Sequence, residues 1–170
     1  TNANDNDPVI TSVATANVAE NTTAVLTVSA TDGDRDTPTF TVTGGADSAL
    51  FTIDLNSGAL AFIAAPDFDS PGSDAGTNTY LVEVTADDGN GNTIDVFQNI
   101  VINDTQNPVP NVTNLPDVTG QCSATITTTP TATDTCGGTI TGTTSDALTR
   151  STQGTSTVTW TFDDGNGQTV

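Results

Sequence analysis

Residues 80–102 read YLVEVTADDGNGNTIDVFQNIVI and contain the clearest strand pattern of the chain. Every second residue forms one run of inward candidates, Tyr80, Val82, Val84 and Ala86, and a second run, Val96, Gln98, Ile100 and Ile102, on either side of a cluster of Asp, Asn and Gly. A period of two places the apolar side chains on one face of a β-strand, and Asp, Asn and Gly favour turns. The stretch therefore predicts two strands separated by a turn.

Shorter runs of the same kind occur throughout the first half of the chain. Their alternating apolar residues are Leu26, Val28 and Ala30, then Phe40 and Val42, then Leu60 and Phe62. No stretch has a helical period longer than about two turns. About seven short strands over roughly 105 residues are typical of an immunoglobulin-like β-sandwich, so we expect an all-β fold.

The charge balance of the chain is strongly acidic. Among 170 residues there are 21 acidic side chains and two basic ones, Arg35 and Arg150, and the net charge is −19. Nucleic acid is not an expected partner, because phosphate binding needs a basic surface. We expect no direct insertion into a membrane, because no segment is long and apolar enough to cross a bilayer.

Short sequence motifs that occur twice, here called internal echoes, divide the chain into two modules. The three matching pairs are residues 4–9 with 103–110, residues 29–32 with 131–134, and residues 85–93 with 161–169. The first pair places Asn and Asp just before Pro-Val, which suits an extended linker that leads into a first strand. We therefore expect two tandem, related β-sandwiches, over residues 1–107 and 108–170.

The second module has its own strand signal and an open end. Val158, Trp160 and Phe162 alternate on one face of what the pattern predicts to be a strong strand, with Trp160 in the core. The sequence stops at Val170, directly after the turn that in the first module leads into the last strand. We expect that this strand is missing by truncation. The alternative is a strand donated by a neighbouring chain.

The acidic residues gather in short clusters, and close carboxylates repel each other by roughly 1 kcal/mol per pair in water. A fold that brings them together needs a counter-charge, and the chain has almost no basic residues to supply it. Calcium prefers six to eight oxygen ligands from carboxylates, amides and backbone carbonyls. Asp and Asn are also ordinary turn formers. That alternative does not explain the pairing of acids, so we expect bound Ca²⁺.

Several motifs resemble those of a cadherin repeat, in the version found in large bacterial surface proteins. The resemblance covers about residues 4–108 and consists of Ala19-Glu20-Asn21, Ala30-Thr31-Asp32-Gly33-Asp34, Phe51-Thr52-Ile53-Asp54, Ser57-Gly58-Ala59-Leu60, Ala65-Pro66-Asp67-Phe68-Asp69 and Val84-Thr85-Ala86-Asp87-Asp88-Gly89. In that family, calcium sits between successive repeats. The resemblance therefore implies calcium-binding linkers at both ends of the first module.

The resemblance also implies two sets of ligands. The first set comprises Asp5, Asn6 and Asp7 with Asp32, Asp34 and Asp87 or Asp88. The second set comprises Glu20, Asp67 and Asp69 with Asn103 and Asp104. Asp69 stands where the family usually has Glu, and the linker after residue 103 is poorer in acid than the family pattern.

The second module resembles a hyalin-repeat (HYR-type) immunoglobulin-like domain over about residues 108–170. The matching segments are residues 120–124, 132–138 and 157–167. The resemblance implies a disulfide between Cys122 and Cys136. The internal echo places Asp134 and Asp163 or Asp164 at positions equivalent to Asp32 and Asp87 or Asp88, where they would complete a site with Asp104.

These features favour a structural role outside the cell. We expect a secreted or cell-surface segment of an adhesin stalk or extracellular filament, stiffened by calcium, whose partners are neighbouring repeats or identical subunits. The alternative is an adhesion module that binds carbohydrate, ice or another cell through its Thr-rich runs, such as residues 125–129. We do not expect an enzyme, because the chain has no His or Lys for the usual nucleophile–base arrangements.

Overall fold

The computed structural model describes residues 6–134 and 138–170 and confirms the all-β prediction. The chain forms two compact units, residues 1–104 and residues 105–170. In the described part of the chain, no helix has the length and apolarity needed to cross a membrane. The only helical element there is a single 3₁₀ turn, η1 (Ser48–Leu50).

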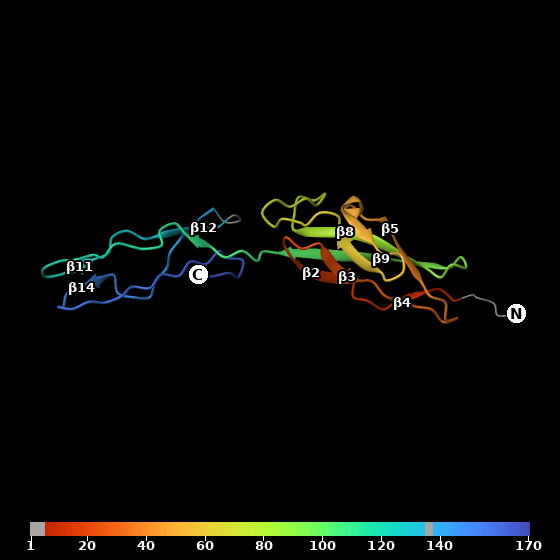
Figure 1. The fold of residues 1–170 in the computed structure, drawn as a ribbon, viewed down its shortest axis with the longest axis horizontal. Coiled ribbons are helices and arrows are strands. Elements are labelled where there is room, and N and C mark those ends of the chain that lie inside the picture. The colour runs from red at the N-terminus through yellow and green to blue at the C-terminus, as the bar shows by residue number, and fades with distance from the viewer. Residues whose placement is uncertain (1–5, 135–137) are drawn as a thin grey trace. The chain divides into compact units, whose positions relative to one another are not determined.

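The first unit is a sandwich of two main sheets (Figure 1). One sheet has four strands in the order β2 (Thr15–Ala19), β9 (Thr93–Asn103), β8 (Thr79–Asp87) and β5 (Thr39–Gly44). The other has three strands in the order β3 (Ala24–Thr27), β7 (Ala59–Phe62) and β6 (Phe51–Ile53). A short pair, β1 (Val9–Ile10) and β4 (Ala30–Thr31), completes the unit.

The strands that the sequence predicts most clearly form the centre of this unit. β8 and β9 are antiparallel neighbours, and Tyr80 pairs with Ile100 in their register. The four predicted inward residues of β8, from Tyr80 to Ala86, are at most 2% exposed. The period-two prediction is therefore confirmed for this hairpin.

Three aromatic side chains join the two sheets of the first unit. The rings of Phe51 and Phe62 lie 4.3 Å apart, and the ring of Phe62 lies 5.2 Å from that of Tyr80 in an edge-to-face arrangement. Phe51 and Phe62 belong to the three-stranded sheet, whereas Tyr80 belongs to the four-stranded one. Such aromatic pairs add to the stabilisation from apolar burial, so this cluster helps to hold the two sheets together.

The second unit has shorter strands. One sheet has the order β10 (Val109–Pro110), β12 (Thr131–Asp134) and β13 (Gly138–Thr141), and the other pairs β11 (Ala124–Thr125) with β14 (Thr149–Arg150). Isolated bridges join Thr143 to Thr161 and Asp163 to Thr169. Its buried hydrophobic side chains in the described range are Ala132 and Phe162.

The prediction of a strong strand over residues 158–162 is wrong. Phe162 is buried, but Val158 and Trp160 are half-buried, so Trp160 is not the core residue that the pattern predicts. The backbone forms no continuous strand there, because an isolated bridge joins Thr161 to Thr143 and Phe162 exchanges two hydrogen bonds with Val170. The N–H of Thr159 donates to Oδ2 of Asp146 at 2.7 Å, so a side chain takes the place of a neighbouring strand there.

Two predicted residues lie outside the described part of the chain, namely Asp5 and Cys136. Cys122 is described and is exposed. The pairing of Cys122 with Cys136 therefore stays a prediction.

Candidate metal centres

The acidic turn after β8 occurs a second time in the second unit, with the same geometry. Asp87 pairs with Thr93 across the first turn, and Asp163 pairs with Thr169 across the second. In each turn the first Asp accepts a hydrogen bond from a glycine N–H, from Gly89 to Asp87 at 2.7 Å and from Gly165 to Asp163 at 2.8 Å. The sequence echo is thus a structural repeat.

The second Asp of each turn organises the backbone. Oδ1 of Asp88 accepts from the N–H of Asn90 at 2.7 Å and of Asn92 at 3.1 Å. Oδ1 of Asp164 accepts from the N–H groups of the matching residues, 166 and 168, at 2.7 and 3.1 Å. The sequence leaves open which of two adjacent Asp residues takes this role, and the hydrogen bonds assign it to Asp88 and Asp164.

A second repeated element brings another carboxylate to the same end of each unit. Val9 pairs with Thr31 in the first unit, and Val109 pairs with Thr133 in the second, in the same register. Asp32 directly follows β4, and Asp134 is the last residue of β12. The backbone therefore places these two carboxylates at equivalent positions.

In the second unit, the two repeated elements bring their carboxylates together. Oxygens of Asp134 and Asp164 lie within 4.8 Å of each other, and Asp134 is buried. Oδ2 of Asp164 is buried and accepts no hydrogen bond from any residue that the structure describes. The sequence analysis leaves Asp163 and Asp164 open, and the proximity to Asp134 selects Asp164.

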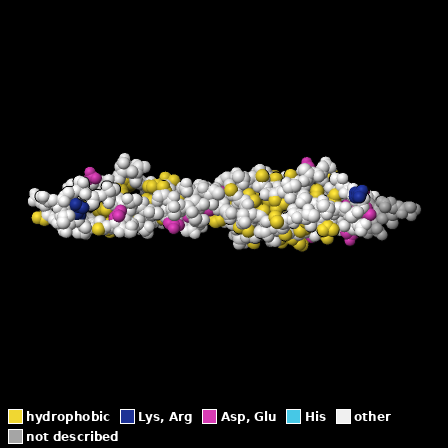
Figure 2. Space-filling view, turned by 90° about the horizontal axis from the view of Figure 1, so that it is seen from below, with side chains coloured by type: hydrophobic (Ala, Val, Ile, Leu, Met, Phe, Trp, Pro, Cys, Tyr) yellow, Lys and Arg dark blue, Asp and Glu magenta, His cyan; other side chains and the backbone are white. Residues whose placement is uncertain are grey.

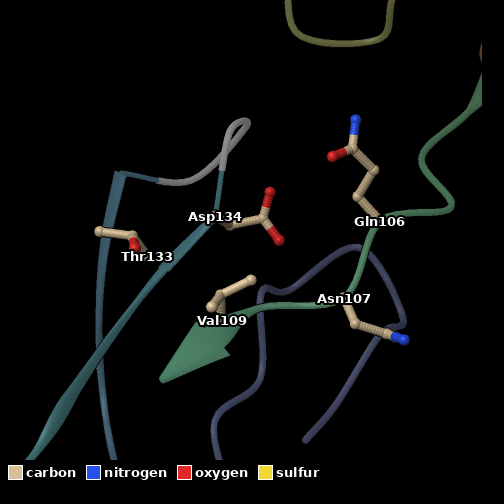
Figure 3. Close-up of a pocket in the computed structure, with 5 residues that line it drawn as sticks. All are labelled: Gln106, Asn107, Val109, Thr133 and Asp134. Atoms are coloured by element: carbon tan, nitrogen blue, oxygen red, sulfur yellow. The ribbon is translucent and has the colours of Figure 1, made fainter. Parts of the chain in front are cut away.

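A small pocket beside Asp134 is lined by linker side chains of the same unit (Figure 3). The lining residues are Gln106, Asn107, Val109, Thr133 and Asp134. The carboxylate of Asp134 points toward the segment that carries Gln106 and Asn107. The sequence prediction did not include these two amides. Gln106 and Asn107 precede Pro-Val just as Asn6 and Asp7 do in the first linker, and this sequence match could have identified them.

In the first unit, the N-terminal carboxylates are more widely spread. Asp34 accepts from the backbone N–H and from Nδ2 of Asn6, at 3.1 and 2.9 Å. Oδ1 of Asp32 accepts from the N–H of Asp34 at 2.7 Å, and Oδ2 of Asp32 is buried without a partner among the described residues. Asp7 is exposed. Among the described residues at this end, no three carboxylates approach within 4.8 Å of one another.

The C-terminal end of the first unit holds the other predicted set. Glu20 is 2% exposed, and its Oε2 accepts from the N–H of Phe68 at 3.4 Å. Oδ1 of Asp67 accepts from the N–H of Asp69 at 2.9 Å, while Oδ1 of Asp69 is buried without a partner in the described range.

The last strand contributes to the same end of the first unit. The carbonyl oxygen of Asn103 accepts from the N–H of Glu20 at 3.0 Å, which ties the end of β9 to the end of β2. The side chain of Asn103 is exposed, whereas Asp104 is 5% exposed. The backbone thus holds Glu20 next to the strand end that leads to Asp104.

The arrangement of these carboxylates suits a bound calcium ion, because without a cation their negative charges repel one another. Buried carboxylate oxygens need hydrogen bonds or a cation, because burial of an unpaired charge is costly. Three such oxygens, on Asp32, Asp69 and Asp164, have no donor among the described residues. Basic side chains are sparse in Figure 2, and the chain has only two. An all-oxygen donor set of this kind is the type that Ca²⁺ prefers.

Acid should destabilise the first unit through Asp88. The hydrogen bond from the N–H of Asn90 is the main cause that lowers the pKa of Asp88 below its ordinary value, and the hydrogen bonds from Nδ2 and the N–H of Asn92 add to it. The N–H of Ser57 likewise lowers the pKa of Asp54. A lowered pKa contributes stability above the ordinary value, and this stability is lost as the pH falls through the folded-state pKa.

We therefore expect the urea midpoint of the metal-free chain to fall as the pH drops below about 5. Replacement of Asp88 by Asn should flatten this dependence, because the variant carries no carboxyl group that titrates at this position. An Asp88→Asn variant with the full acid dependence of the wild type would contradict the assignment.

Comparison with known proteins identifies the fold. No family model matches the chain, and no curated protein matches it. Among solved structures, it is similar to the extracellular domain of protocadherin gamma B4, with a TM-score of 0.55, 24% identity, and coverage of 88% of this chain and 26% of that one. It is also similar to extracellular cadherin domains 3–6 of protocadherin gamma B2, with a TM-score of 0.57, 18% identity, and coverage of 85% and 39%.

A human structure gives the same result. The EC1-2 fragment of human protocadherin-24 matches with a TM-score of 0.52 and 16% identity, over 82% of this chain and 66% of that one. The chain thus has a cadherin-like, immunoglobulin-type β-sandwich fold. It spans only about a quarter of the protocadherin gamma B4 chain.

Proposed function

We propose that this chain is a calcium-stiffened structural segment of an extracellular protein, in a secreted or cell-surface adhesin stalk or filament. Its partners would be neighbouring repeats or identical subunits. Two observations support the proposal together: the cadherin-like fold, and the repeated acidic elements with buried carboxylate oxygens that lack donors in the described range. The chain has a net charge of −19 and only two basic side chains to neutralise its carboxylates.

The proposed ligands fall into three groups. The first is at the N-terminal end of the first unit and comprises Asp5, Asn6, Asp7, Asp32, Asp34, Asp87 and Asp88. The second is at its C-terminal end and comprises Glu20, Asp67, Asp69, Asn103 and Asp104. The third belongs to the second unit and comprises Asp134, Asp163 and Asp164, with Gln106 and Asn107 from the linker. Asp104 directly precedes the second unit in the chain, so we propose that it also serves this third group.

The chain's own residues would prepare these sites. The hydrogen bonds to Oδ1 of Asp164 fix its carboxylate and leave Oδ2 for a cation. Calcium, when bound, supplies positive charge that holds linker and unit oxygens together. The junction between repeats would then resist bending, whereas a linker without calcium would leave neighbouring repeats free to move.

Neutralisation of Asp134 tests the proposal. We expect Asp134→Asn to weaken the affinity of the second-unit site for Ca²⁺ by about tenfold or more, because the site loses one charged ligand and calcium affinity depends on the number of charged ligands. A tenfold loss corresponds to about 1.4 kcal/mol. Isothermal titration calorimetry with CaCl₂ measures this. Asp117→Asn is the matched control, since Asp117 is exposed and outside all three groups. Equal affinities of both variants and the wild type would contradict the proposal.

The alternative of a Thr-based ligand surface gains no support from the second unit. A flat surface of regularly spaced Thr side chains that binds a ligand would need long, regular strands. In the described residues, the run at 125–129 contributes only the end of β11, and Thr161 contributes an isolated bridge.

The HYR-type resemblance and a bacterial source remain proposals, together with the disulfide that the resemblance implies. A bond between Cys122 and Cys136 would close a loop of about 15 residues and contribute roughly 3 kcal/mol. The intact mass after alkylation, with and without prior reduction, determines whether the two thiols are free.

A further inference from the structure

Each of the two acidic turns contains an Asn-Gly pair, Asn90–Gly91 and Asn166–Gly167. All four residues are exposed. Asn followed by Gly is chemically the least stable Asn sequence, because glycine has no side chain that hinders attack of its backbone nitrogen on the preceding side chain. The proposed metal sites use the carboxylates of these turns but give the Asn-Gly pairs no role.

The reaction available to such a pair needs only water. The glycine backbone nitrogen loses its proton and bonds to Cγ of Asn, the Cγ–Nδ2 bond breaks, and Nδ2 leaves as ammonia after it takes up a proton. Water then opens the resulting succinimide at either carbonyl carbon. The products are Asp and iso-Asp, and no electrons are transferred.

In the second turn, a carboxylate holds the attacking nitrogen. The N–H of Gly167 donates to Oδ1 of Asp164 at 3.1 Å. Loss of this proton would break a hydrogen bond to a charged acceptor and would place a second negative charge beside the carboxylate. The folded turn therefore opposes the first step of the reaction.

The first turn holds the leaving nitrogen. Nδ2 of Asn90 donates to Oδ2 of Asp36 at 3.1 Å, which ties the leaving amide to the loop after β4. Oδ1 of Asp88 accepts from the N–H of Asn90 and of Asn92, so it fixes the backbone on both sides of Gly91. The folded turn therefore opposes rotation of the Asn90 side chain toward the Gly91 nitrogen.

We propose that Asn90 and Asn166 are sites of spontaneous conversion to Asp and iso-Asp, and that the carboxylates of Asp88 and Asp164 suppress this conversion in the folded chain. Each conversion adds one negative charge. At Asn90 it also replaces the donor to Asp36 by a carboxylate oxygen, so two like charges would face each other where a hydrogen bond was. The modification would loosen the turns that carry the candidate metal ligands.

The test follows conversion in the intact chain by peptide mass spectrometry during incubation at neutral pH, with a chelator present so that the result does not depend on bound metal. We expect Asp164→Ala to raise the rate at Asn166 by about tenfold, the factor that corresponds to a hydrogen bond to a charged group. The rate at Asn90 in the same molecules should stay unchanged. Asp163→Ala is the matched control, because Asp163 accepts from Gly165 and not from Gly167.

A second comparison applies if Asp164→Ala unfolds the second unit. The wild-type chain is incubated once in its folded state and once unfolded in urea. The conversion rate of both Asn residues should be lower in the folded state by a factor of about ten or more. The reciprocal variant, Asp88→Ala, should accelerate Asn90 alone. Equal rates at Asn166 in the wild type and in a folded Asp164→Ala variant would overturn the proposal, as would equal rates in the folded and the urea-unfolded wild type.

Discussion

Removal of calcium should lower the melting temperature of this chain by roughly 10–20 °C. Sites of extracellular modules bind calcium with dissociation constants of about 10⁻⁴–10⁻³ M. At a calcium concentration about a hundredfold above this constant, one site stabilises the folded state by about 2.7 kcal/mol. For a domain of about 100 residues, each kcal/mol shifts the melting temperature by about 4–8 °C. Differential scanning calorimetry with calcium and with chelator measures the shift.

Ionic strength is the necessary control for this experiment. A net charge of −19 destabilises the compact state by self-repulsion, and any salt screens part of it. NaCl at matched ionic strength should therefore recover only a small part of the lost stability. If NaCl restores the melting temperature as fully as calcium does, the effect is general screening and the proposed sites do not explain it.

Replacement of Phe62 by Ala should cost about 3–5 kcal/mol in the free energy of unfolding of the first unit. Phe62 is 4% exposed, and its ring contacts Phe51 and Tyr80, which belong to different sheets. The substitution leaves a cavity between the aromatic side chains that join the two sheets. Urea denaturation followed by the circular dichroism of the β-sheets measures the loss.

Phe97→Ala is the matched control for this substitution. Phe97 is on β9 and is 49% exposed, so the same chemical change should alter the free energy by about 0.5 kcal/mol or less. A cost at Phe62 no larger than that at Phe97 would contradict the assignment of the core.

The sequence predicts the first unit well because its strands are long enough to show their period. Over β8, four inward residues in succession identify one buried face. The same alternation correctly places Gln98 in the core, although glutamine is usually exposed. Both amide atoms of Gln98 are buried without a partner among the described residues, and no sequence pattern could show this.

The second unit is harder to predict because its strands are only two to four residues long. Periodicity finds the buried face of residues 158–162 but cannot show that Asp146 takes the N–H of Thr159. That contact is set by residues 13 positions apart and depends on the tertiary fold.

For the candidate sites, the sequence identifies the acidic elements but not the state of each oxygen. Asp163 and Asp164 are adjacent and chemically identical. Only the hydrogen bonds of the turn show that Oδ1 of Asp164 holds the backbone while its Oδ2 has no donor in the described range. Repeats within the chain supply the remaining information, since Asp88 occupies the same place in the first unit.

Equilibrium dialysis of the intact chain against radioactive calcium tests the central claim most directly, because it counts bound ions without reference to stability. We predict saturable binding of at least one Ca²⁺ per chain, with a dissociation constant of about 10⁻⁴–10⁻³ M, and its reduction in Asp134→Asn. An absence of saturable binding up to about 10⁻² M calcium in the folded wild-type chain would contradict the account.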